Sequence, residues 1–205
     1  SRRARPVRAA PRSGQERPER PARPPMPMPC AQRCRSTTRD IRLSVLIRAK
    51  PELIYRSLTS ACELTRWWLL GAETDARNTG RVRMMWPRMR GVAGRRCPGF
   101  GEREGVFVDL EPARKVAWLW KPVRGERHAP PLISIFILPV RGGGEVTVLH
   151  AGFPAASSAD RVYRHYALAL EDGLAKLKLY LETGRTCKME LIDLESARVL
   201  TRARR

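Results

Sequence analysis

Short apolar stretches, most of them alternating with polar residues, recur along the chain from residue 41 to residue 150. Such alternation is typical of half-buried β-strands, and residues 132–138, which are apolar on both faces, are typical of a central strand. The stretch Arg141-Gly-Gly-Gly144 is a hairpin turn signal between the last two strands. In each of the other five predicted strands, one set of positions shares a face. These sets are Ile41, Leu43, Val45 and Ile47; Val82, Met84 and Trp86; Val106, Val108 and Leu110; Val116, Trp118 and Trp120; and Val146, Val148 and His150.

Three helices are predicted around these strands. Pro51 suits the first position of a short helix, and Ser60 followed by Glu63 is a capping box that begins a second one. A long amphipathic helix follows the last strand and ends at Gly184, a residue type favoured at helix C-termini. Its apolar face holds Tyr163, Tyr166, Ala167, Leu170, Leu174, Leu177 and Leu181, and its polar side holds Arg161, Arg164, Glu171, Asp172 and Lys178. We expect that polar side, including its paired carboxylates, to face solvent.

The order of these elements predicts an α+β fold. A strand, two short helices, a run of antiparallel strands and one long helix indicate a curved antiparallel sheet of about six to seven strands packed against the C-terminal helix. We assign residues 41–184 to this domain, residues 1–40 to an arm and residues 185–205 to a C-terminal tail. A short further strand or helix is expected in the tail between Met189 and Leu200.

The charge of the chain first suggests a polyanionic partner. The 205 residues include 40 Lys+Arg and 20 Asp+Glu, a formal net charge of +20, while a hydrophobic fraction of 42% is enough to form a core. However, residues 1–40 hold +8 of this charge together with 8 of the 17 prolines and no aromatic residue, which predicts a disordered arm. Of the basic residues 34 are Arg, a bias that GC-rich codons explain. Nucleic-acid binding is therefore not expected as the main function.

Cysteine usage and hydropathy favour a cytoplasmic protein. No C-x-x-C pair occurs among the five cysteines and the three histidines lie near none of them, so we expect neither a disulfide framework nor a metal site. The longest strongly apolar run, residues 131–140, is too short to span a bilayer. No apolar segment follows the N-terminal arginines, so we expect no secretory signal. Without such a signal, the five cysteines favour a reducing compartment. We expect neither membrane association nor a cofactor.

Several segments, in a fixed order, carry a resemblance to a known family. They are Ile47-Arg-Ala-Lys-Pro-Glu-Leu-Ile-Tyr-Arg-Ser-Leu-Thr59 with Leu64-Thr-Arg-Trp-Trp68, Gly105-Val-Phe-Val-Asp-Leu-Glu-Pro112 with Trp118, Gly143-Gly-Glu-Val-Thr-Val-Leu-His-Ala-Gly-Phe153, and Leu179-Tyr-Leu-Glu-Thr-Gly184. Residues 41–184 resemble the SRPBCC (START-like, helix-grip) domains, and among them the heat-shock-protein-90 ATPase activator homologue C-terminal-domain type. The resemblance implies a cavity between a concave sheet and its long helix, which either fills with side chains or holds an apolar ligand.

Three features depart from the family pattern. A Gly-Gly pair usually follows the second strand, and here Asn78-Thr79-Gly80 keeps only the last glycine. The terminal helix often carries Gly-Trp, where this chain has Ala167-Leu168-Ala169. Eukaryotic co-chaperones of this type also carry a separate N-terminal chaperone-binding domain, which a disordered arm of 40 residues cannot be. We therefore expect a stand-alone bacterial member without a chaperone partner.

Aromatic and apolar side chains are the candidates to line the implied cavity. Tryptophan and tyrosine combine a large apolar surface with one hydrogen-bond donor, which suits a mostly apolar ligand. The candidate ligand-binding residues are Met84, Trp86, Trp118, Trp120, His150, Tyr166 and Leu170. The alternative interpretation is a filled aromatic core. Trp67 and Trp68 are expected to pin the two short helices onto the sheet, and the alternative is that they anchor the mouth of the cavity.

A glycine- and arginine-rich loop, residues 87–103, is a weaker candidate for anion binding. Its arginines could surround an anionic head group or a phosphate; they are Arg88, Arg90, Arg95, Arg96 and Arg103. No Lys-Ser/Thr pair follows its glycines, so it is not a P-loop. A solvated hairpin loop is the alternative interpretation.

The favoured function is the binding of a small apolar ligand, or an accessory or stress-related role, without catalysis. No G-x-S-x-G or H-E-x-x-H motif occurs, so we assign no catalytic residue and no metal ligand. The first alternative is a cyclase- or aromatase-like enzyme with His150 or Tyr166 as proton donor. It requires a hydroxyl or a carboxylate, such as Asp75, Asp109 or Glu111, within about 3 Å of the imidazole. The second alternative is a nucleic-acid-associated protein that acts through the arm.

Overall fold

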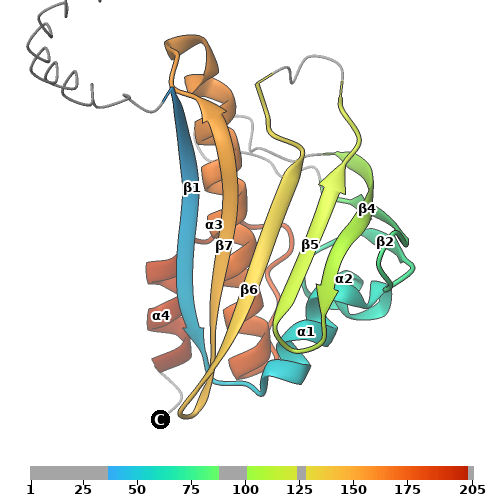
Figure 1. The fold of residues 1–205 in the computed structure, drawn as a ribbon. Helices are drawn as coiled ribbons and strands as arrows, with labels where there is room; N and C mark the ends of the chain where they lie inside the picture. Colours follow the sequence, from blue (N-terminus) through green and yellow to red (C-terminus); the bar gives the residue numbers. More distant parts are fainter. Residues whose placement is uncertain (1–36, 88–100, 124–127, 203–205) are drawn as a thin grey trace, which may run out of the picture. The chain divides into compact units, whose positions relative to one another are not determined.

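The computed structural model describes residues 37–87, 101–123 and 128–202. Within these ranges the strands form one seven-stranded antiparallel sheet in the order β1-β7-β6-β5-β4-β3-β2 (Figure 1). The strands are β1 Thr38–Ile47, β2 Gly71–Thr74, β3 Arg81–Met85, β4 Glu102–Glu111, β5 Lys115–Trp120, β6 Leu132–Val140 and β7 Gly143–Pro154. The predicted α+β class with an antiparallel sheet is confirmed.

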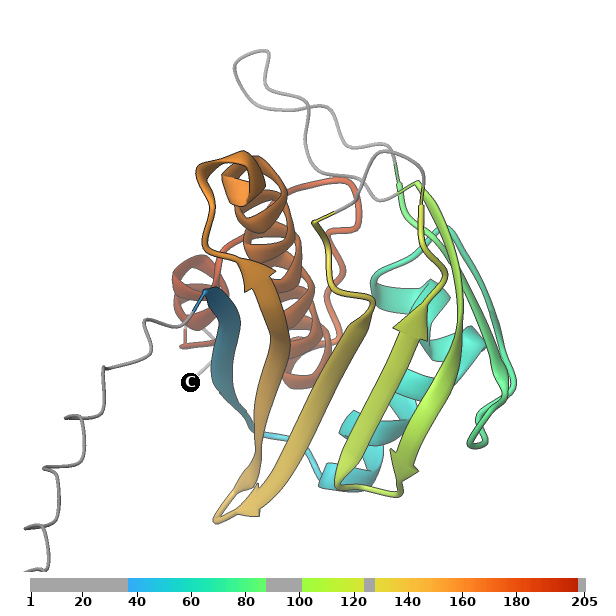
Figure 2. The same ribbon diagram turned by 45° about the horizontal axis from the view of Figure 1, so that its top comes forward.

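The helices of the described residues complete a helix-grip arrangement. They are α1 Pro51–Thr59, α2 Ala61–Trp67, the 3-10 turn η2 Ser157–Ala159, α3 Asp160–Thr183 and α4 Leu194–Arg202. Helices α1, α2 and α3 lie on the same face of the sheet (Figures 1 and 2). The core lies between them and is one cluster of buried side chains, which includes Ile54 and Leu64 of the short helices, Leu174 of α3 and Val148 of β7. Helix α4 is the short element expected in the tail.

Three element boundaries follow local sequence signals. Helix α1 begins at Pro51, as predicted, and the Ser60 side chain accepts a hydrogen bond from the backbone N–H of Glu63 at the start of α2. Helix α3 ends at Gly184, whose φ of 71° is left-handed and whose N–H donates to the Tyr180 carbonyl oxygen at 2.7 Å. These predicted boundaries are confirmed.

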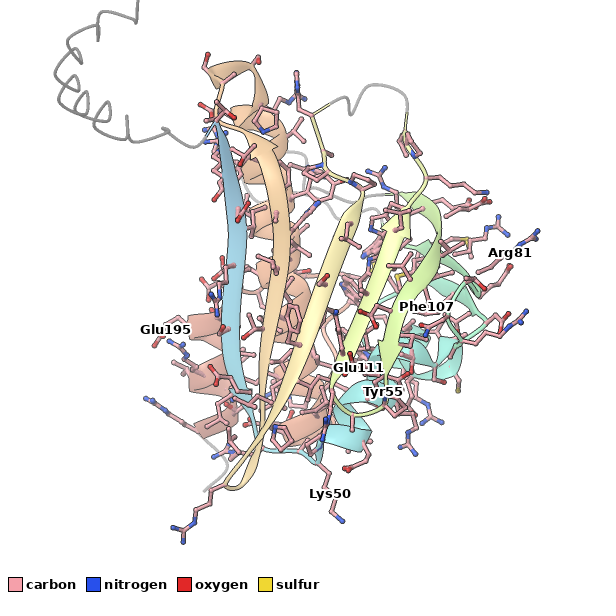
Figure 3. The ribbon with its side chains drawn as sticks, viewed as in Figure 1. Lys50, Tyr55, Arg81, Phe107, Glu111 and Glu195 are labelled. Atoms are coloured by element: carbon pink, nitrogen blue, oxygen red, sulfur yellow. The ribbon has the colours of Figure 1, made fainter. Side chains whose placement is uncertain are left out.

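The residues of β4 that face the core are those that alternate with its valines, and not the valines themselves. Phe107, which Figure 3 labels on this strand, is buried together with Arg103 and Gly105, whereas Val108 is exposed on the other face. The register with β5 shifts between Phe107 and Asp109, as it does at a β-bulge. The helices therefore meet a face of β4 that carries an arginine and a glycine.

The polar side of α3 is covered around its paired carboxylates, which corrects the expectation that they face solvent. Asp172 is buried because the segment after α3 folds back over this side of the helix. The Ile192 N–H donates to the Asp172 carboxylate at 3.0 Å, and the Leu194 N–H donates to the Glu171 carboxylate at 3.4 Å. An amphipathic pattern predicts which side of a helix is apolar. It does not show that a later segment covers the polar side by hydrogen bonding to its carboxylates.

Replacing Thr79 with glycine is expected to stabilise the domain by about 1 kcal/mol. Thr79 has a φ of 68°, a left-handed conformation that a β-branched residue adopts only under strain. Its side chain is exposed, and its backbone N–H, which glycine retains, donates to the Phe107 carbonyl oxygen at 2.8 Å. This is the position where the resembled family usually has the first glycine of its pair. Urea unfolding measures the change, and Thr147→Gly in β7 is the control that should lower stability. An unchanged or reduced stability of Thr79→Gly would contradict the strain argument.

Candidate functional site

A small cavity lies between the inner face of the sheet and α3. Its volume is about 20 Å³, which is room for one water molecule. Its walls are the side chains of Trp68, Trp86, Arg103, Trp118, Trp120, Ile133, Tyr166 and Leu170. Trp86 directly follows β3, Arg103 is the second residue of β4 and Trp120 is the last residue of β5. The cavity therefore lies at the end of the sheet where the chain passes from β3 to β4 and from β5 to β6.

The indole rings of the wall contact one another in series. The ring centroids of Trp68 and Trp86 are 5.3 Å apart at an interplanar angle of 89°, and those of Trp86 and Trp120 are 6.0 Å apart at 72°. Trp118 and Trp120 follow at 5.8 Å, and Trp67 stacks on Trp68 at 5.2 Å. Edge-to-face contacts of this kind are favourable for aromatic rings. The cavity thus has a continuous aromatic wall.

Among the polar groups of this mostly apolar wall, those of Arg103 and Trp118 are almost fully buried. The Arg103 side chain belongs to it although only 6% of the residue is exposed. The Nε1 of Trp118 is buried and has no hydrogen-bond partner among the described residues. Buried donors in proteins almost always have an acceptor. The Trp118 N–H therefore marks a place where an acceptor atom of a water or ligand is favoured.

Comparison with known families assigns this fold. The sequence model of the family described as "Activator of Hsp90 ATPase homolog 1-like protein" matches residues 48–182. The chain belongs to this family. The match spans most of the described domain, from the end of β1 to the last turn of α3, and it confirms the resemblance to the Hsp90 ATPase activator type of SRPBCC domain. No curated protein matches the chain.

Solved structures similar to this family member share its fold. The protein SSP2350 from Staphylococcus saprophyticus has a TM-score of 0.58 at 14% identity, covering 74% of this chain and 98% of that one. The Aha1 dimer from Colwellia psychrerythraea has a TM-score of 0.53 at 22% identity, with coverages of 72% and 98%. CalU16 from Micromonospora echinospora has a TM-score of 0.53 at 14% identity, with coverages of 81% and 86%. At these identities the likeness concerns the fold alone.

The seven candidate ligand-binding residues are all buried, but they do not all meet at the cavity. Trp86, Trp118, Trp120, Tyr166 and Leu170 belong to its wall. Met84 and His150 are buried elsewhere in the core. A ligand-binding role for any of them stays a prediction. Of the arginines in the candidate anion-binding loop, only Arg103 is among the described residues. Most of the N-terminal arm also lies outside them, as do Arg88, Arg90, Arg95 and Arg96.

His150 lies behind the cavity wall and is held as a neutral imidazole. A carbonyl oxygen can only accept, so Nε2 of His150 donates to the Pro130 carbonyl oxygen at 2.6 Å. In the neutral ring, Nδ1 then carries the lone pair. The ring makes edge contacts with Phe153 at 4.6 Å and with Tyr166 at 4.8 Å between centroids. Burial lowers the pKa of His150 to about 4. The imidazole is therefore uncharged at pH 7 and is a poor proton donor there.

The geometry required by the enzyme alternative is missing around His150 in the part of the chain that the structure describes. Its Nδ1 has no hydrogen-bond partner there, and its Nε2 bonds a backbone carbonyl. Asp75 bonds to Arg77 at 2.7 Å and Asp109 bonds to Lys115 at 2.5 Å, so neither carboxylate orients the imidazole. Across residues 37–87, 101–123 and 128–202 there is also no cluster of His, Cys, Asp or Glu that could hold a metal ion. No helix of those residues is long and apolar enough to cross a membrane.

Three residues of the wall, Trp68, Arg103 and Ile133, were not among the seven candidate ligand-binding residues. The sequence suggests Arg103 only as part of the anion-binding loop and Trp68 only as an alternative anchor at the mouth of the cavity. Trp67 ties the two short helices to each other, because its Nε1 in α2 donates to the Ser57 carbonyl oxygen of α1 at 3.1 Å, whereas its neighbour Trp68 belongs to the cavity wall. Arg103 is four residues before Phe107 on β4, so the two side chains lie on the same face of the strand. Sequence analysis does not place Arg103 in the core, because a charged residue is not expected there.

Proposed function

We propose that the protein is a ligand-binding member of its family that holds a small, mostly apolar molecule against the tryptophan wall. The observation that carries the proposal is the cavity between the sheet and α3, whose wall contains four tryptophans, a tyrosine and the buried indole N–H of Trp118. Aromatic surface with a few polar groups is the usual lining of small-molecule sites. Cytoplasmic location and an accessory role without catalysis belong to the same proposal.

The size of the cavity requires side chains to move when a ligand enters. A second void of about 20 Å³ lies deeper in the core, toward Leu58 and Leu177. The two voids share Trp68, Trp118 and Leu170 as walls. Displacing these shared side chains joins the voids into one larger space. Binding in this case shifts the population toward a more open core, and the ligand supplies the contacts that the displaced side chains give up.

Binding of the neutral fluorescent probe N-phenyl-1-naphthylamine tests the proposal. We expect saturable binding with one site per chain. Ile133→Phe should weaken binding by about tenfold, because Ile133 is a buried wall residue and the larger ring fills the space. Its neighbour Leu132 is exposed, so Leu132→Phe is the matched control and should bind as the unchanged protein does. Near-ultraviolet circular dichroism checks that both variants are folded.

Two results would count against a ligand-binding function: a probe that never saturates, or equal effects of the two phenylalanine variants. Native mass spectrometry of the protein purified from its own host then identifies the natural ligand. A co-purifying small molecule that Ile133→Phe excludes supports the same conclusion without an artificial probe.

A further inference from the structure

We propose that the free edge of β1 is a docking site for an extended acidic segment of a partner protein, which adds to the sheet as a further strand. The inference concerns the rim of the sheet and does not depend on the cavity. It follows from two unpaired backbone positions of β1 and from the arginines that lie beside them.

Among the described strands, β1 is the last one on its side of the sheet, because it pairs with β7 alone. Figure 1 shows it at the rim, with α4 beside its C-terminal half. In an antiparallel strand, residues whose N–H and C=O bond to the neighbouring strand alternate with residues whose groups point away from it. Every second residue of β1 therefore presents a donor and an acceptor to the free edge.

Helix α3 covers this edge near both ends of the strand. The Asp40 carbonyl oxygen accepts a hydrogen bond from the Tyr163 hydroxyl at 3.3 Å, and the Leu46 carbonyl oxygen accepts one from the Lys178 ammonium at 2.8 Å. Because these carbonyls bond to a helix instead of to β7, the even-numbered residues of β1 are those that point away from β7.

Arg42 and Ser44 lie between the two covered positions and have the same orientation. Both residues are exposed, and no hydrogen bond to their edge-facing backbone groups comes from the described residues. Backbone groups without a protein partner are nearly always solvated. An unpaired strand edge is a template for another chain, and an extended peptide that adds to it gains main-chain hydrogen bonds. The middle of β1 is therefore open to such pairing.

A groove beside this edge gives the added strand a second surface. It lies between β1 and α4 and has a volume of about 300 Å³. Its walls are Val45, Leu46, Arg48, Lys178, Arg198, Thr201 and Arg202. Leu46 is 51% exposed, so the groove offers an apolar contact among basic side chains. A peptide that pairs with Ser44 continues into this groove.

The charge of this surface favours an acidic segment. Arg42 and Arg202 form no ion pair within the part of the chain that the structure describes. The side chains of Arg48 and Lys178 share one carboxylate, that of Glu182. Opposite charges across an interface steer association and suppress wrong partners. Carboxylates on the added strand therefore find cations along the edge and at the groove.

A second copy of the chain is a less suitable occupant. Its own edge would bring the same arginines, and the chain has a formal net charge of +20, so the two edges repel each other. Asp40 is the one acidic residue of β1, and its carboxylate accepts the Gly152 N–H of β7 at 2.8 Å, on the side away from the free edge. The edge thus lacks the negative charge that self-pairing needs.

Fluorescence anisotropy with a short labelled peptide of alternating glutamate and valine at pH 7 tests the inference. We expect saturable binding with one site per chain. The same peptide with its backbone nitrogens methylated lacks the donors for the edge carbonyls and should bind about tenfold more weakly. It carries the same charge, so attraction to arginines elsewhere in the chain affects both peptides equally.

Variants of β1 test the site from the side of the protein. Ser44→Pro removes an edge-facing N–H and should weaken binding of the glutamate peptide by about tenfold, while the sheet retains its own hydrogen bonds. Ser44→Ala keeps that N–H and is the matched control, which should bind as the unchanged protein does. Arg42→Gln should weaken binding by about threefold. Arg114→Gln, at an exposed arginine in the turn between β4 and β5, should leave binding unchanged.

Three results would overturn the inference: no binding of the glutamate peptide, equal binding of its methylated form, or equal effects of Arg42→Gln and Arg114→Gln. The methylated peptide keeps the test decisive if Ser44→Pro does not fold. Analytical ultracentrifugation of the chain without peptide should show a monomer. A dimer that Ser44→Pro dissociates would assign the edge to a second copy and exclude the acidic partner. A single-stranded oligonucleotide that binds as tightly as the peptide and is insensitive to Ser44→Pro would reduce the surface to simple anion binding and overturn strand addition.

Discussion

Replacing Asp172 with asparagine is expected to lower the free energy of unfolding by about 3–5 kcal/mol. The Asp172 and Lys176 side chains are 5% and 2% exposed, one turn apart on α3, and their charged groups are 2.7 Å apart. Asparagine is nearly isosteric, so packing is retained, but it leaves the Lys176 ammonium buried without its counter-ion. Guanidinium chloride unfolding at pH 7 measures the loss.

The same carboxylate also anchors the C-terminal segment. Its second oxygen accepts the Ile192 N–H at 3.0 Å, and the Lys176 ammonium donates to the Lys188 carbonyl oxygen at 3.4 Å. Asp172→Asn should therefore raise amide hydrogen exchange in residues 185–193 as well as lowering global stability. This second readout separates the loss of an anchor from a general loosening of α3.

An exposed ion pair on α4 is the matched control for Asp172. Glu195 and Arg198 are 72% and 49% exposed, and Figure 3 shows Glu195 pointing away from the domain, so Glu195→Gln should change stability by about 0.5 kcal/mol or less. Burial raises the pKa of the Asp172 carboxyl in spite of Lys176, which indicates that the pair is held at a desolvation cost. The double variant Asp172→Leu with Lys176→Met should consequently regain most of the lost stability. Equal small effects of Asp172→Asn and Glu195→Gln would contradict the argument.

The parts of the fold that sequence predicts well are those that depend on local periodicity. Trp118 and Trp120 are two residues apart on a strand, and Tyr166 and Leu170 are four apart on a helix, so each pair must share a face. Burial of the apolar face then brings both pairs into the same core. Helix caps such as Gly184 are equally local, because the conformation they require is a property of one residue.

Features that depend on a register shift or on a distant segment were not predictable in this way. Arg103 faces inward because it shares the face of Phe107 on β4, and the valines on either side of Phe107 suggest the opposite face. The register shift between Phe107 and Asp109 breaks the alternation further. Asp172 is buried because residues some twenty positions later cover it, which a helical pattern cannot indicate. His150 is identified as buried by its strand, but its carbonyl partner comes from the loop at Pro130. Such partners are set by tertiary structure alone.

Lowering the pH from 7 to 4 is expected to reduce the stability of the domain by about 3 kcal/mol through His150 alone. The pKa of this imidazole falls from its ordinary 6.5 to about 4 in the folded protein, because burial disfavours its charged form. Since the unfolded chain binds the proton more readily, stability decreases as the pH falls below about 6.5, and the loss is complete below about 4. Urea unfolding at pH 7, 5.5 and 4 follows this loss.

The variant His150→Gln isolates the contribution of the imidazole from that of the carboxylates. Glutamine can still donate to the Pro130 carbonyl oxygen but does not titrate, so the variant should be less stable than the unchanged protein at pH 7 and should lose less stability on going to pH 4. The difference between the two pH profiles should approach about 3 kcal/mol at pH 4. His128→Gln, at a half-buried histidine in the loop before β6, is the control and should retain the full pH dependence. If stability depended on pH in the same way in His150→Gln and in the unchanged protein, His150 would bind a proton as readily in the folded core as in the unfolded chain. The assignment of a neutral imidazole behind the cavity wall would then be wrong.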